Sequence, residues 1–497
     1  MLATVIAAEN EKGAISALKK AEGSDLVELR LDYIKNLDLE SGFLSDFISI
    51  AKSRKKPVIV TNRKKDDGGF FSGSESDRIL ALKKAICLGA DYVDIENSAD
   101  SGSIKGLIGN KKTTKVILSY HNFNETPDNL KEIYSDMKKL KPDFIKIAAN
   151  ANSAEDNFKI FDLIRDANRE KIKITAFCMG SYGQFSRILG IILGSCIDYA
   201  SAENGKGLAA GQLSTEEMNS EYNAMSINKN TKIAGIIGNP VEHSWSHVIY
   251  NAAFGKMNIN AIYLKFKVDR LGEFIGYFKR LNILGFSVTI PHKVEVMKYL
   301  DGIDEKAKAI GAVNTIVSKN KKLIGYNTDC GGAILALKSK TQLKGKNAVI
   351  LGAGGSARAI AYGLMENCAN VTLLNRTLEK AKSIAGDFGC GFGALSDLSK
   401  KDYDILINST SVGMHPNVNA SPIPARMIKK GAVVFDIVFN PLKTKLLKEA
   451  ERKGCITIPG LEMLLHGNAL QFKLWINKEA PFNLMRERAL GYAKNIK

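Results

Sequence analysis

Short β-rich apolar runs alternate with helical segments through the first 200 residues of the chain. Eight such runs predict strands at 4–7, 26–32, 58–61, 92–96, 116–121, 144–148, 172–177 and 197–201. Eight strands separated mostly by helices within this length are typical of a (β/α)8 barrel. We therefore predict an α/β barrel in the N-terminal part of the chain.

Several of these predicted strands keep one polar face. The polar residues that alternate with apolar ones are Glu28, Arg30 and Asp32, then Asp94 and Glu96, then Ser119 and His121. A barrel strand buries its outer face under helices, so the polar side chains should point inward or toward the C-terminal rim. Because barrel active sites lie at that rim, we expect a charged pocket there.

Two neighbouring strand ends carry residues suited to carbonyl chemistry. Strand 144–148 places Lys146 on the same face as Phe144 and Ala148. A lysine held among apolar groups has a lowered pKa and becomes nucleophilic toward carbonyls, although a lysine here can also simply reach water at the rim. His121 ends the preceding strand and either moves protons near neutral pH or serves as a structural hydrogen-bonding group. The pair on adjacent strands favours a Schiff-base site.

The polar segment 213–230 lacks periodic apolar positions, and we interpret it as a linker flanked by helical turns. A new α/β pattern begins at Thr231, and no internal repeat relates it to the first half. Within the new pattern, residues 345–377 are typical of a strand, a glycine turn, a helix and a second strand.

The turn inside 345–377 has the features of a dinucleotide site. It consists of Gly352-Ala353-Gly354-Gly355, and the residues Ser356 and Ala357 open the helix. Glycines let the backbone approach a pyrophosphate, and a helix N-terminus offers free N–H groups and the positive end of its dipole. A glycine turn can also merely join a strand to a helix, but its placement in a β-α-β unit favours a dinucleotide.

The second strand of this unit ends in Asn375-Arg376-Thr377. An NAD site usually places an acidic residue at this point for the ribose hydroxyls, whereas a cation suits the 2′-phosphate of NADP. The alternative is that Thr377 caps the next helix and Arg376 is solvated. We predict NADP(H) as the cofactor.

The composition narrows the class of protein. A chain of 497 residues with 45% hydrophobic and 25% charged residues is globular, with two to four domains. No apolar run has the length of a membrane span, and strand-like sequence begins by Thr4, so we expect no signal or transit peptide ahead of the fold. Seven cysteines without a C-x-x-C pair and six unclustered histidines favour reduced thiols over disulfides or a metal site.

The net charge of +18 comes from lysines spread along the predicted helices. A basic block would favour nucleic acid, whereas this distribution favours a solvated basic surface that suits anionic substrates. We therefore expect no nucleic-acid partner.

Five motifs of the first half resemble type I 3-dehydroquinate dehydratase over roughly residues 1–220. They are ELRLD at 28–32, SYHNF at 119–123, FIKIA at 144–148, MGSYGQFSR at 179–187 and GQ at 211–212. The resemblance implies that Lys146 forms an imine with the C3 ketone of 3-dehydroquinate. It also implies that His121 removes a C2 proton and assists loss of the C1 hydroxyl as water. The substrate-binding residues that it implies are Glu28, Arg30, Arg63, Asp67, Arg187 and Gln212.

Two positions depart from that family's pattern. Asp67 precedes Gly68-Gly69 where the family has glutamate, so its hydrogen bond to His121 should be lost or mediated by water. Leu208 replaces a hydroxyl residue in the closing loop, which also lacks the family's proline. We expect weaker binding or slower turnover with the chemistry retained.

Turn motifs of the second half carry candidate polar groups at GNPVEHSWSH (238–247), GFSVTIPHK (285–293), GAVNT (311–315) and GYNTD (325–329). Each alone is ordinary turn or cap chemistry. Together with the glycine turn they resemble shikimate dehydrogenase. The resemblance extends to the C-terminus through NRT at 375–377, NSTSVGM at 408–414, DIVFNP at 436–441 and GLEML at 460–464.

This second resemblance implies a substrate lobe at 231–330 joined by C-terminal helices at 456–497, and a Rossmann nucleotide lobe at 331–455. Lys293 and Asp329 would be the catalytic pair, with Lys293 polarising and protonating the C3 carbonyl oxygen of 3-dehydroshikimate during reduction by NADPH. The implied substrate-binding residues are Ser244, Ser246, Thr289, Asn314 and Phe439. The implied cofactor residues are Gly352, Ala353, Gly354, Gly355, Ser356 and Ala357 for the pyrophosphate, Asn375, Arg376 and Thr377 for the 2′-phosphate side, and Gly460 for the nicotinamide end.

Two departures concern substrate binding. Gly467 stands where the family has glutamine, and Phe439 stands where it has a tyrosine that faces the substrate. Each loss removes a hydrogen bond worth about 0.5–1.5 kcal/mol, and His466 or Asn468 is a candidate replacement. Ser287 resembles the plant-type fused enzyme.

The product of the first implied reaction is the substrate of the second. This coincidence predicts a bifunctional 3-dehydroquinate dehydratase–shikimate dehydrogenase of the shikimate pathway, which leads to chorismate and the aromatic amino acids. The alternatives are an NAD-dependent quinate/shikimate dehydrogenase, against which Arg376 argues, and a fusion in which one half is inactive. We expect small-molecule substrates, no nucleic acid, no membrane and no metal, with a location in the cytoplasm or in an organelle after processing.

Overall fold

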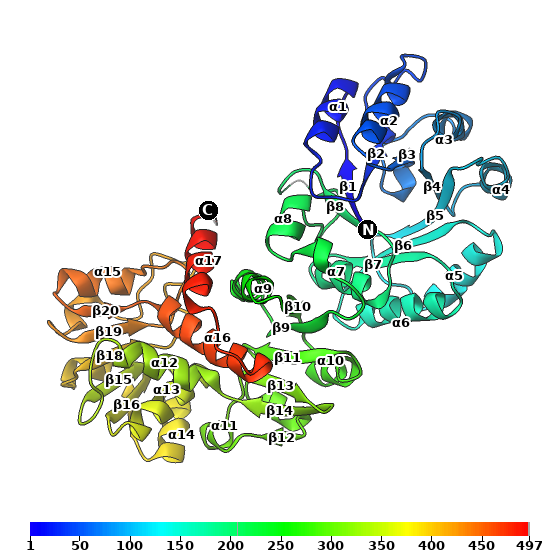
Figure 1. Cartoon of the computed structure of the whole chain (residues 1–497). Helices are drawn as coiled ribbons and strands as arrows, with labels where there is room; N and C mark the ends of the chain where they lie inside the picture. The colour runs from blue at the N-terminus through cyan, green and yellow to red at the C-terminus, as the bar shows by residue number, and fades with distance from the viewer. Residues whose placement is uncertain (206, 496–497) are drawn as a thin grey trace. The chain divides into compact units, whose positions relative to one another are not determined.

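The computed structural model describes residues 1–205 and 207–495. The chain divides into two compact units (Figure 1). The first comprises Met1–Thr231 with Phe266–Tyr277, and the second comprises Lys232–Lys265 with Phe278–Lys497.

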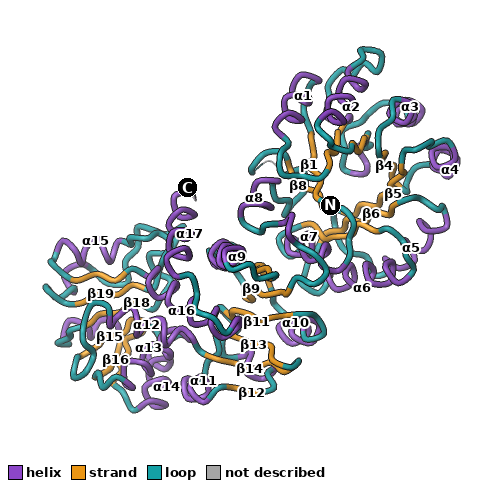
Figure 2. The backbone as a smooth tube through the Cα atoms, in the orientation of Figure 1, coloured by secondary structure: helices purple, strands orange, loops and turns teal. Residues whose placement is uncertain are grey.

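An eight-stranded parallel sheet forms the first unit, with helices on the outside of the ring of strands (Figure 2). The strands are β1 (Leu2–Ile6), β2 (Leu26–Arg30), β3 (Val58–Thr61), β4 (Tyr92–Glu96), β5 (Lys115–Asn122), β6 (Phe144–Asn150), β7 (Ile174–Met179) and β8 (Asp198–Ser201). The helices are α1 (Glu11–Lys20), α2 (Phe43–Ser53), α3 (Glu75–Cys87), α4 (Ser101–Gly109), α5 (Leu130–Lys139), α6 (Asp156–Arg169) and α7 (Gln184–Leu193). The predicted barrel is confirmed, with strand ends shifted by a few residues.

The strands follow in order from β1 to β7, and β8 pairs with β1. The ring closes between β7 and β8 through two bonds from the loop ahead of β8. The amide of Cys196 donates to the carbonyl of Ile174 at 2.8 Å, and the amide of Ile197 donates to Oγ1 of Thr175 at 3.0 Å.

The barrel interior is layered along the strands. Apolar side chains such as Leu26, Ile117 and Phe144 fill the layer at the N-terminal strand ends. One pleat repeat further on, the inward positions include Glu28 and Lys146, and both side chains are buried. Alternation in the sequence therefore places the charged layer toward the C-terminal rim, as predicted.

Most of the segment interpreted as a linker belongs to the first unit. It contains α8 (Thr215–Ser220) and a short 3-10 helix at Ala224–Ser226. Ser214 and Glu217 form a capping box at the start of α8, and the Thr215 hydroxyl lies 2.8 Å from that of Thr4 in β1. The helical turns expected at this segment are α8 and the 3-10 helix, and both belong to the first unit.

The second unit begins with a six-stranded mixed sheet in the order β10-β9-β11-β13-β14-β12. Its strands are β9 (Lys232–Gly238), β10 (Ala261–Lys267), β11 (Ile283–Val288), β12 (Gly302–Ile303), β13 (Thr315–Lys319) and β14 (Lys322–Tyr326). The helices α9 (Ser246–Lys256) and α11 (Glu305–Ile310) belong to this unit. Helix α10 (Leu271–Phe278) lies, except for its last residue, in the stretch that belongs to the first unit.

A second six-stranded sheet, wholly parallel, has the order β17-β16-β15-β18-β19-β20. Its strands are β15 (Asn347–Leu351), β16 (Asn370–Asn375), β17 (Gly391–Ala394), β18 (Ile405–Asn408), β19 (Val433–Asp436) and β20 (Ile456–Ile458). The helices α13 (Gly355–Glu366), α14 (Leu378–Phe388) and α15 (Lys445–Arg452) connect them. The strand order reverses between β15 and β18, which is where Rossmann folds bind dinucleotides.

Helix α12 (Thr328–Lys338) leads from the mixed sheet to the parallel sheet, and α16 (Gly460–Ile476) returns beside it. The two helices approach closely, because a Cβ on Gly332 would lie only 2.8 Å from the amide nitrogen of Gly467. The last helix, α17 (Phe482–Asn495), packs against α9.

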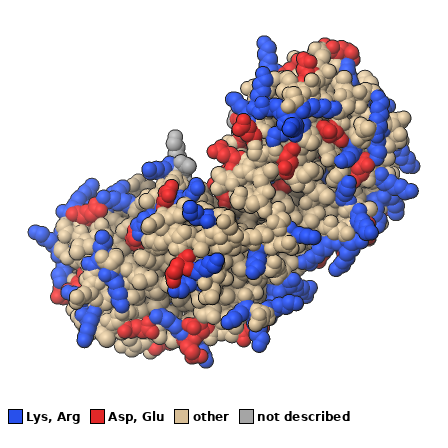
Figure 3. Space-filling model, in the orientation of Figure 1, with Lys and Arg blue, Asp and Glu red and all other residues tan. Residues whose placement is uncertain are grey.

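Three features bear on the class of protein. None of the helices within residues 1–205 and 207–495 is long and apolar enough to cross a membrane. All seven cysteines are free thiols. On the face seen in Figure 3, Lys and Arg side chains are scattered and interspersed with Asp and Glu.

Candidate active sites

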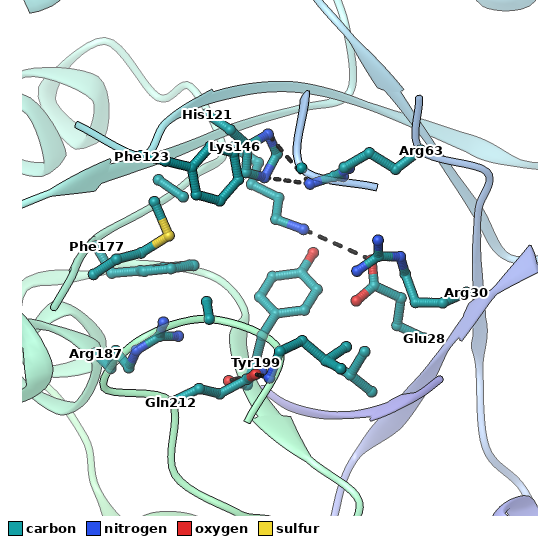
Figure 4. A pocket seen from close by; sticks show the side chains of 16 residues that line it. Glu28, Arg30, Arg63, His121, Phe123, Lys146, Phe177, Arg187, Tyr199 and Gln212 are labelled. Carbon is teal, nitrogen blue, oxygen red and sulfur yellow. Dashed lines mark hydrogen bonds and ion pairs between the residues drawn. The ribbon is translucent and has the colours of Figure 1, made fainter. Parts of the chain in front are cut away.

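A pocket opens at the C-terminal end of the barrel strands (Figure 4). The two catalytic candidates Lys146 and His121 line this pocket. The predicted substrate-binding residues that also line it are Glu28, Arg30, Arg63, Arg187 and Gln212. Parallel strands end at one rim, so residues far apart in sequence meet here.

Lys146 projects from β6 into this pocket and is almost fully buried. Its Nζ lies 3.2 Å from Oδ2 of Asp94 and 3.7 Å from Oε1 of Glu28. The expectation that Lys146 lies among apolar groups is therefore wrong, because the inward faces of β2 and β4 bring two carboxylates to it. The ring of Tyr199 completes its surroundings, with the ring centroid 3.8 Å from Nζ.

His121 projects from β5, the neighbour of β6. In the register of these strands Ser119 pairs with Lys146, so His121 lies two residues further toward the rim on the same face. Burial, followed by the positive charges of Arg63 and Lys146, holds the pKa of His121 well below its ordinary value of 6.5. The imidazole is therefore neutral near pH 7 and able to accept a proton.

Arg63 connects His121 to the acidic layer of the barrel. Its Nη1 contacts the imidazole, its Nη2 lies 2.7 Å from Oδ1 of Asp94, and its Nε lies 3.3 Å from Oε1 of Glu96. Burial opposes the ionisation of Asp94, but the charges of Arg63 and Lys146 outweigh it and hold the pKa of Asp94 well below its ordinary value. Asp94 is thus a buried carboxylate shared by two cations.

The pocket arginines differ in what they already bind. Arg30 makes two hydrogen bonds to the carboxylate of Asp32, at 2.9 and 2.7 Å. Arg187 is also buried and lies over the ring of Phe177, but its Nε and Nη2 make no hydrogen bond within the described part of the chain. A buried guanidinium with free N–H groups at a pocket wall is suited to a ligand carboxylate.

Two loops at the rim were expected to differ from the family pattern. Asp67 is described, but it does not line the pocket: its Oδ2 accepts from the Ser98 hydroxyl at 2.6 Å and lies 3.4 Å from Nζ of Lys64. The shorter aspartate side chain stays at the outer side of the rim, so its predicted place in the substrate site is not supported. Phe123 packs over Gly68 instead and stacks on the His121 ring at 6.2 Å.

The closing loop holds Gln212 at the pocket. Nε2 of the Gln212 side chain donates to the backbone carbonyl of Tyr199 at 3.2 Å, and its Oε1 accepts from the backbone N–H of Leu208 at 2.7 Å. Leu208 contributes apolar surface to the same pocket. Gln212 therefore shapes the loop and lines the pocket at once.

A second cavity lies within the second unit, between its two sheets. The predicted substrate and catalytic residues that line it are Ser244, Ser246, Thr289, Lys293, Asn314, Asp329 and Phe439. Lys293 follows β11, and Asp329 lies in the first turn of α12. Their Nζ and Oδ2 are 2.5 Å apart. Asn314 donates from Nδ2 to the other oxygen of Asp329 at 2.8 Å and so fixes the carboxylate.

Lys293 also reaches the predicted dinucleotide turn. Its Nζ lies 3.3 Å from the hydroxyl of Ser356, and a Cβ on Gly355 would lie 3.3 Å from its Cδ. The catalytic pair and the first turn of α13 therefore share one cavity, to which both Ser356 and Gly460 contribute.

The turn after β15 fits a dinucleotide pyrophosphate. Gly352 has a φ of +112°, and a Cβ there would lie 2.6 Å from the hydroxyl of Ser409, so a side chain is excluded. Gly354 occupies the N-cap of α13 without a side-chain cap, and a Cβ there would meet open space. Ala353 and Ala357 pack into the core, which leaves only their backbone groups for a ligand. Free N–H groups beside an open glycine are suited to a phosphate.

The end of β16 carries the predicted 2′-phosphate residues. Arg376 and Thr377 are exposed, and Thr377 occupies the N-cap of α14 without a side-chain hydrogen bond. Nδ2 of the Asn375 side chain donates to the backbone carbonyl of Thr377 at 2.8 Å and stabilises the turn between β16 and α14. An exposed guanidinium at this strand end fits a 2′-phosphate.

The structure shows what stands at the two substituted positions of the second cavity. Phe439 packs edge-on against Trp245 at 5.0 Å. Asn468 and Gln471 line the cavity on α16, whereas His466 stacks on Phe482. The Nδ2 of Asn468 is buried and makes no hydrogen bond among the described residues.

Sequence reasoning missed several residues that these sites use. Asp94 was placed on a polar face but not assigned to the site, because alternation gives the face and not the cross-strand partner. Gln471 lies one helical turn beyond Gly467, and this spacing is the signal that identifies it. Tyr199 occupies an inward position of the eighth strand, and the alternation of that strand was the available signal.

The chain matches three family models in succession. Residues 2–229 match the model described as type I 3-dehydroquinase, residues 236–316 match the shikimate dehydrogenase substrate binding domain, and residues 334–458 match shikimate / quinate 5-dehydrogenase. Together these models cover both units.

Curated relatives and solved structures agree with the models. The chain is 37% identical to the chloroplastic bifunctional 3-dehydroquinate dehydratase/shikimate dehydrogenase of Arabidopsis thaliana, over 97% of this chain and 83% of the relative. It is 48% identical to the shikimate dehydrogenase (NADP(+)) of Pyrococcus furiosus, over 54% of this chain and the whole relative. A crystal structure of a shikimate dehydrogenase in complex with NADP+ is 43% identical, with a TM-score of 0.52, over 54% of this chain and 97% of that one.

Proposed function

Because the chain belongs to the family of bifunctional 3-dehydroquinate dehydratase/shikimate dehydrogenases, it is a two-activity, NADP-dependent enzyme of the shikimate pathway, and we propose which residues perform each reaction. The barrel unit, residues 1–231 here against the predicted 1–220, would carry the dehydratase. The lobes at 231–330 with 456–497 and at 331–455 would carry the dehydrogenase.

The first proposal is that Lys146 attacks the C3 ketone of 3-dehydroquinate and forms an imine. The cationic imine withdraws electrons and so acidifies the neighbouring C2 protons. His121 then takes a C2 proton, for which its neutral imidazole is suited. The electron pair of that C–H bond becomes the new C1–C2 double bond as the C1 hydroxyl leaves, and the protonated His121 supplies the proton that makes the leaving group water. Hydrolysis of the imine restores Lys146.

The observation that carries this proposal is the placement of Lys146 and a half-buried, neutral His121 on adjacent strands. The free guanidinium of Arg187 would hold the substrate carboxylate. Glu28 and Arg30 lie on the other side of the pocket, where they would bind the ring hydroxyls (Figure 4). Arg63 and Asp94 would act by orienting His121 and Lys146.

The second proposal concerns the dehydrogenase cavity. Lys293 would donate a proton to the C3 carbonyl oxygen of 3-dehydroshikimate, and Asp329 would orient the lysine and bind the neighbouring hydroxyl. Ser244, Ser246 and Thr289 would bind the carboxylate and hydroxyls from their positions on the cavity wall. NADPH, when bound, supplies the hydride that reduces C3.

We propose that the glycine turn at 352–355 with Ser356 holds the pyrophosphate of NADP, and that Asn375, Arg376 and Thr377 hold its 2′-phosphate. The exclusion of side chains at Gly352 and the uncapped α13 support the first assignment. Gly460 would lie beside the nicotinamide. Asn468, whose amide nitrogen is buried without a partner among the described residues, would replace the glutamine missing at Gly467.

One coupled experiment tests both halves. With 3-dehydroquinate and NADPH, the wild-type chain should oxidise NADPH, and both Lys146→Ala and Lys293→Ala should abolish this oxidation. Lys146→Ala should recover it when 3-dehydroshikimate is supplied, whereas Lys293→Ala should still form the conjugated product. Lys139→Ala, which alters an exposed ion pair, is the control. Full coupled activity in Lys146→Ala would overturn the imine proposal.

We propose that the enzyme works in the cytoplasm, since seven free thiols suit a reducing compartment. Its partners would be the small anionic substrates. No nucleic-acid partner is proposed, because the lysines are spread along the chain and do not form a basic block.

A further inference from the structure

One hydroxyl in the dehydratase pocket has no function in the mechanism described so far. Tyr199 is the second residue of β8, its side chain is buried, and it lines the pocket with Lys146 and His121. Its hydroxyl makes no hydrogen bond within the residues that the structure describes. Burying a hydroxyl without a partner costs roughly 1–3 kcal/mol, so a phenylalanine would serve the core better.

The ring of Tyr199 is held firmly beside the proposed nucleophile. Nζ of Lys146 lies 3.8 Å from the ring centroid. Gln212 donates to the Tyr199 carbonyl, and the ring of Phe177 lies 6.4 Å away across the pocket floor. Figure 4 shows the Tyr199 hydroxyl pointing toward the end of Lys146 and not into the apolar layer below.

The electrostatic surroundings keep this hydroxyl in its donor form. Burial, followed by the negative charges of Glu28 and Asp94, raises the pKa of Tyr199 well above its ordinary value. Those two carboxylates are already engaged, because Glu28 accepts from Thr61 at 2.7 Å and Asp94 accepts from Ser119 at 2.6 Å. The Tyr199 proton is therefore available to a ligand.

We propose that Tyr199 is a catalytic residue of the dehydratase, whose hydroxyl donates a hydrogen bond to the oxygen on the carbon that Lys146 attacks. This inference rests on the proposed imine site. The carbonyl oxygen at C3 must lie within bonding reach of the Lys146 side chain, and the Tyr199 hydroxyl is an unused donor beside that side chain.

The bond would act while the imine forms. As Nζ bonds to C3, the carbonyl electron pair moves to oxygen, and the Tyr199 hydroxyl stabilises the charge that develops there. The Lys146 ammonium has three protons, of which two leave with that oxygen as water and one stays on the imine nitrogen. The atoms and charges therefore balance, and Tyr199 gives up no proton.

Tyr199→Phe removes the hydroxyl and keeps the ring under Lys146. Since a hydrogen bond made at the reacting oxygen stabilises the transition state, we expect kcat/KM for 3-dehydroquinate to fall about ten-fold or more. The rate at which borohydride-trapped imine accumulates on the chain should fall with it. Because the hydroxyl has no hydrogen-bond partner among the described residues, the unfolding temperature should stay the same or rise.

Tyr134→Phe is the matched control. Tyr134 lies on α5 outside the barrel, and its hydroxyl donates to Glu170 at 2.8 Å. This variant should lose stability and keep its dehydratase kinetics, which is the reverse of the pattern expected for Tyr199→Phe. Dehydrogenase activity with 3-dehydroshikimate and NADPH should be unchanged in both variants.

The outcomes separate this inference from the proposed function. If borohydride traps no adduct on the wild-type chain, the imine site itself is refuted. If the wild type is trapped and Tyr199→Phe is trapped at the same rate with kcat/KM within two-fold, the role of the hydroxyl is refuted. A loss of activity that only matches a loss of stability would make Tyr199 a structural residue and would also refute it.

Discussion

The carboxylate of Asp94 neutralises charge on two buried cations. Its replacement by asparagine measures how much that negative charge contributes to the free energy of unfolding. Its carboxylate lies 2.7 Å from Arg63 and 3.2 Å from Lys146, and all three side chains are buried. Asn at this position keeps the shape and removes the charge. Removing one partner of a buried ion pair costs about 3–5 kcal/mol, because the remaining charge is left uncompensated.

Two other carboxylates offset part of this loss. Glu28 lies 3.7 Å from Lys146, and Glu96 lies 3.3 Å from Arg63. We therefore expect the lower end of the range, about 3 kcal/mol. For a unit of this size such a loss lowers the unfolding temperature by roughly 6–12 °C.

The measurement is thermal inactivation of each activity in the same sample of Asp94→Asn. Dehydratase activity should be lost at the lower temperature, and dehydrogenase activity should be lost at the wild-type temperature. Asp136→Asn is the control, because Asp136 forms an exposed ion pair with Lys139 and should change neither. If Asp94→Asn inactivates at the same temperature as Asp136→Asn, the shared carboxylate does not stabilise the barrel and the reasoning is refuted.

Three further predictions concern single groups. The pKa of His121 lies well below that of an unfolded histidine, so on acidification the unfolded chain binds a proton at this residue before the folded chain does. The free energy of unfolding of the barrel unit, measured in urea, should therefore decrease as the pH is lowered from about 7.5 to about 5.5. This fall should be smaller in His121→Gln, and equal falls would contradict the shift. Gly467→Gln should lower KM for 3-dehydroshikimate about three- to ten-fold, because the added amide can bind the substrate. The position has room for the side chain, since a Cβ there would lie 3.6 Å from its nearest atom, the carbonyl oxygen of Thr328. An unchanged KM would argue against this position as a substrate contact. Gly460→Ala should abolish dehydrogenase activity and leave dehydratase activity unchanged, since the new Cβ would lie 2.3 Å from the carbonyl oxygen of Ile437. Full dehydrogenase activity would show that the close approach of Gly460 to Ile437 is not required.

The alternation of strands and helices along the sequence predicted the barrel. A strand of such a repeat has its outer face covered by helices, so its polar side chains can lie only in the barrel interior or at the rim. The alternation of side chains along each strand brought Lys146 and His121 to one face, and the register of β5 and β6 bears this out. Both are properties of the local sequence, and the cross-strand partners are not. The carboxylate that lies against Lys146 comes from a strand 52 residues earlier in the chain, so the apolar environment expected for the lysine was wrong.

Loop residues were harder to predict for a related reason. A substitution such as glutamate to Asp67 shows that a contact changes, but only the loop conformation shows that the carboxylate turns to Ser98 and Lys64. At Gly467 the sequence showed a missing side chain, and the three-dimensional face of α16 was needed to find Gln471. Tyr199 was overlooked because an aromatic residue in a barrel strand is ordinary core, and only an unsatisfied hydroxyl distinguishes it.

The helix α8 determines where the gene can be divided. The Thr215 hydroxyl contacts that of Thr4 in β1, and Nδ2 of Asn219 donates to the carbonyl of Gly23 at 2.6 Å. Helix α8 is therefore hydrogen-bonded to the first residues of the barrel. Division after residue 220 would leave out the 3-10 helix at Ala224–Ser226, whereas β9 of the second module begins only at Lys232. A reading frame that ends at residue 227 therefore keeps α8 and the 3-10 helix with the barrel strands, but it leaves out Phe266–Tyr277, which also belong to the first unit. A recombination event or a cloning junction placed between 227 and 231 would preserve the contacts of α8 with the start of the barrel, and it would separate the barrel strands from Phe266–Tyr277.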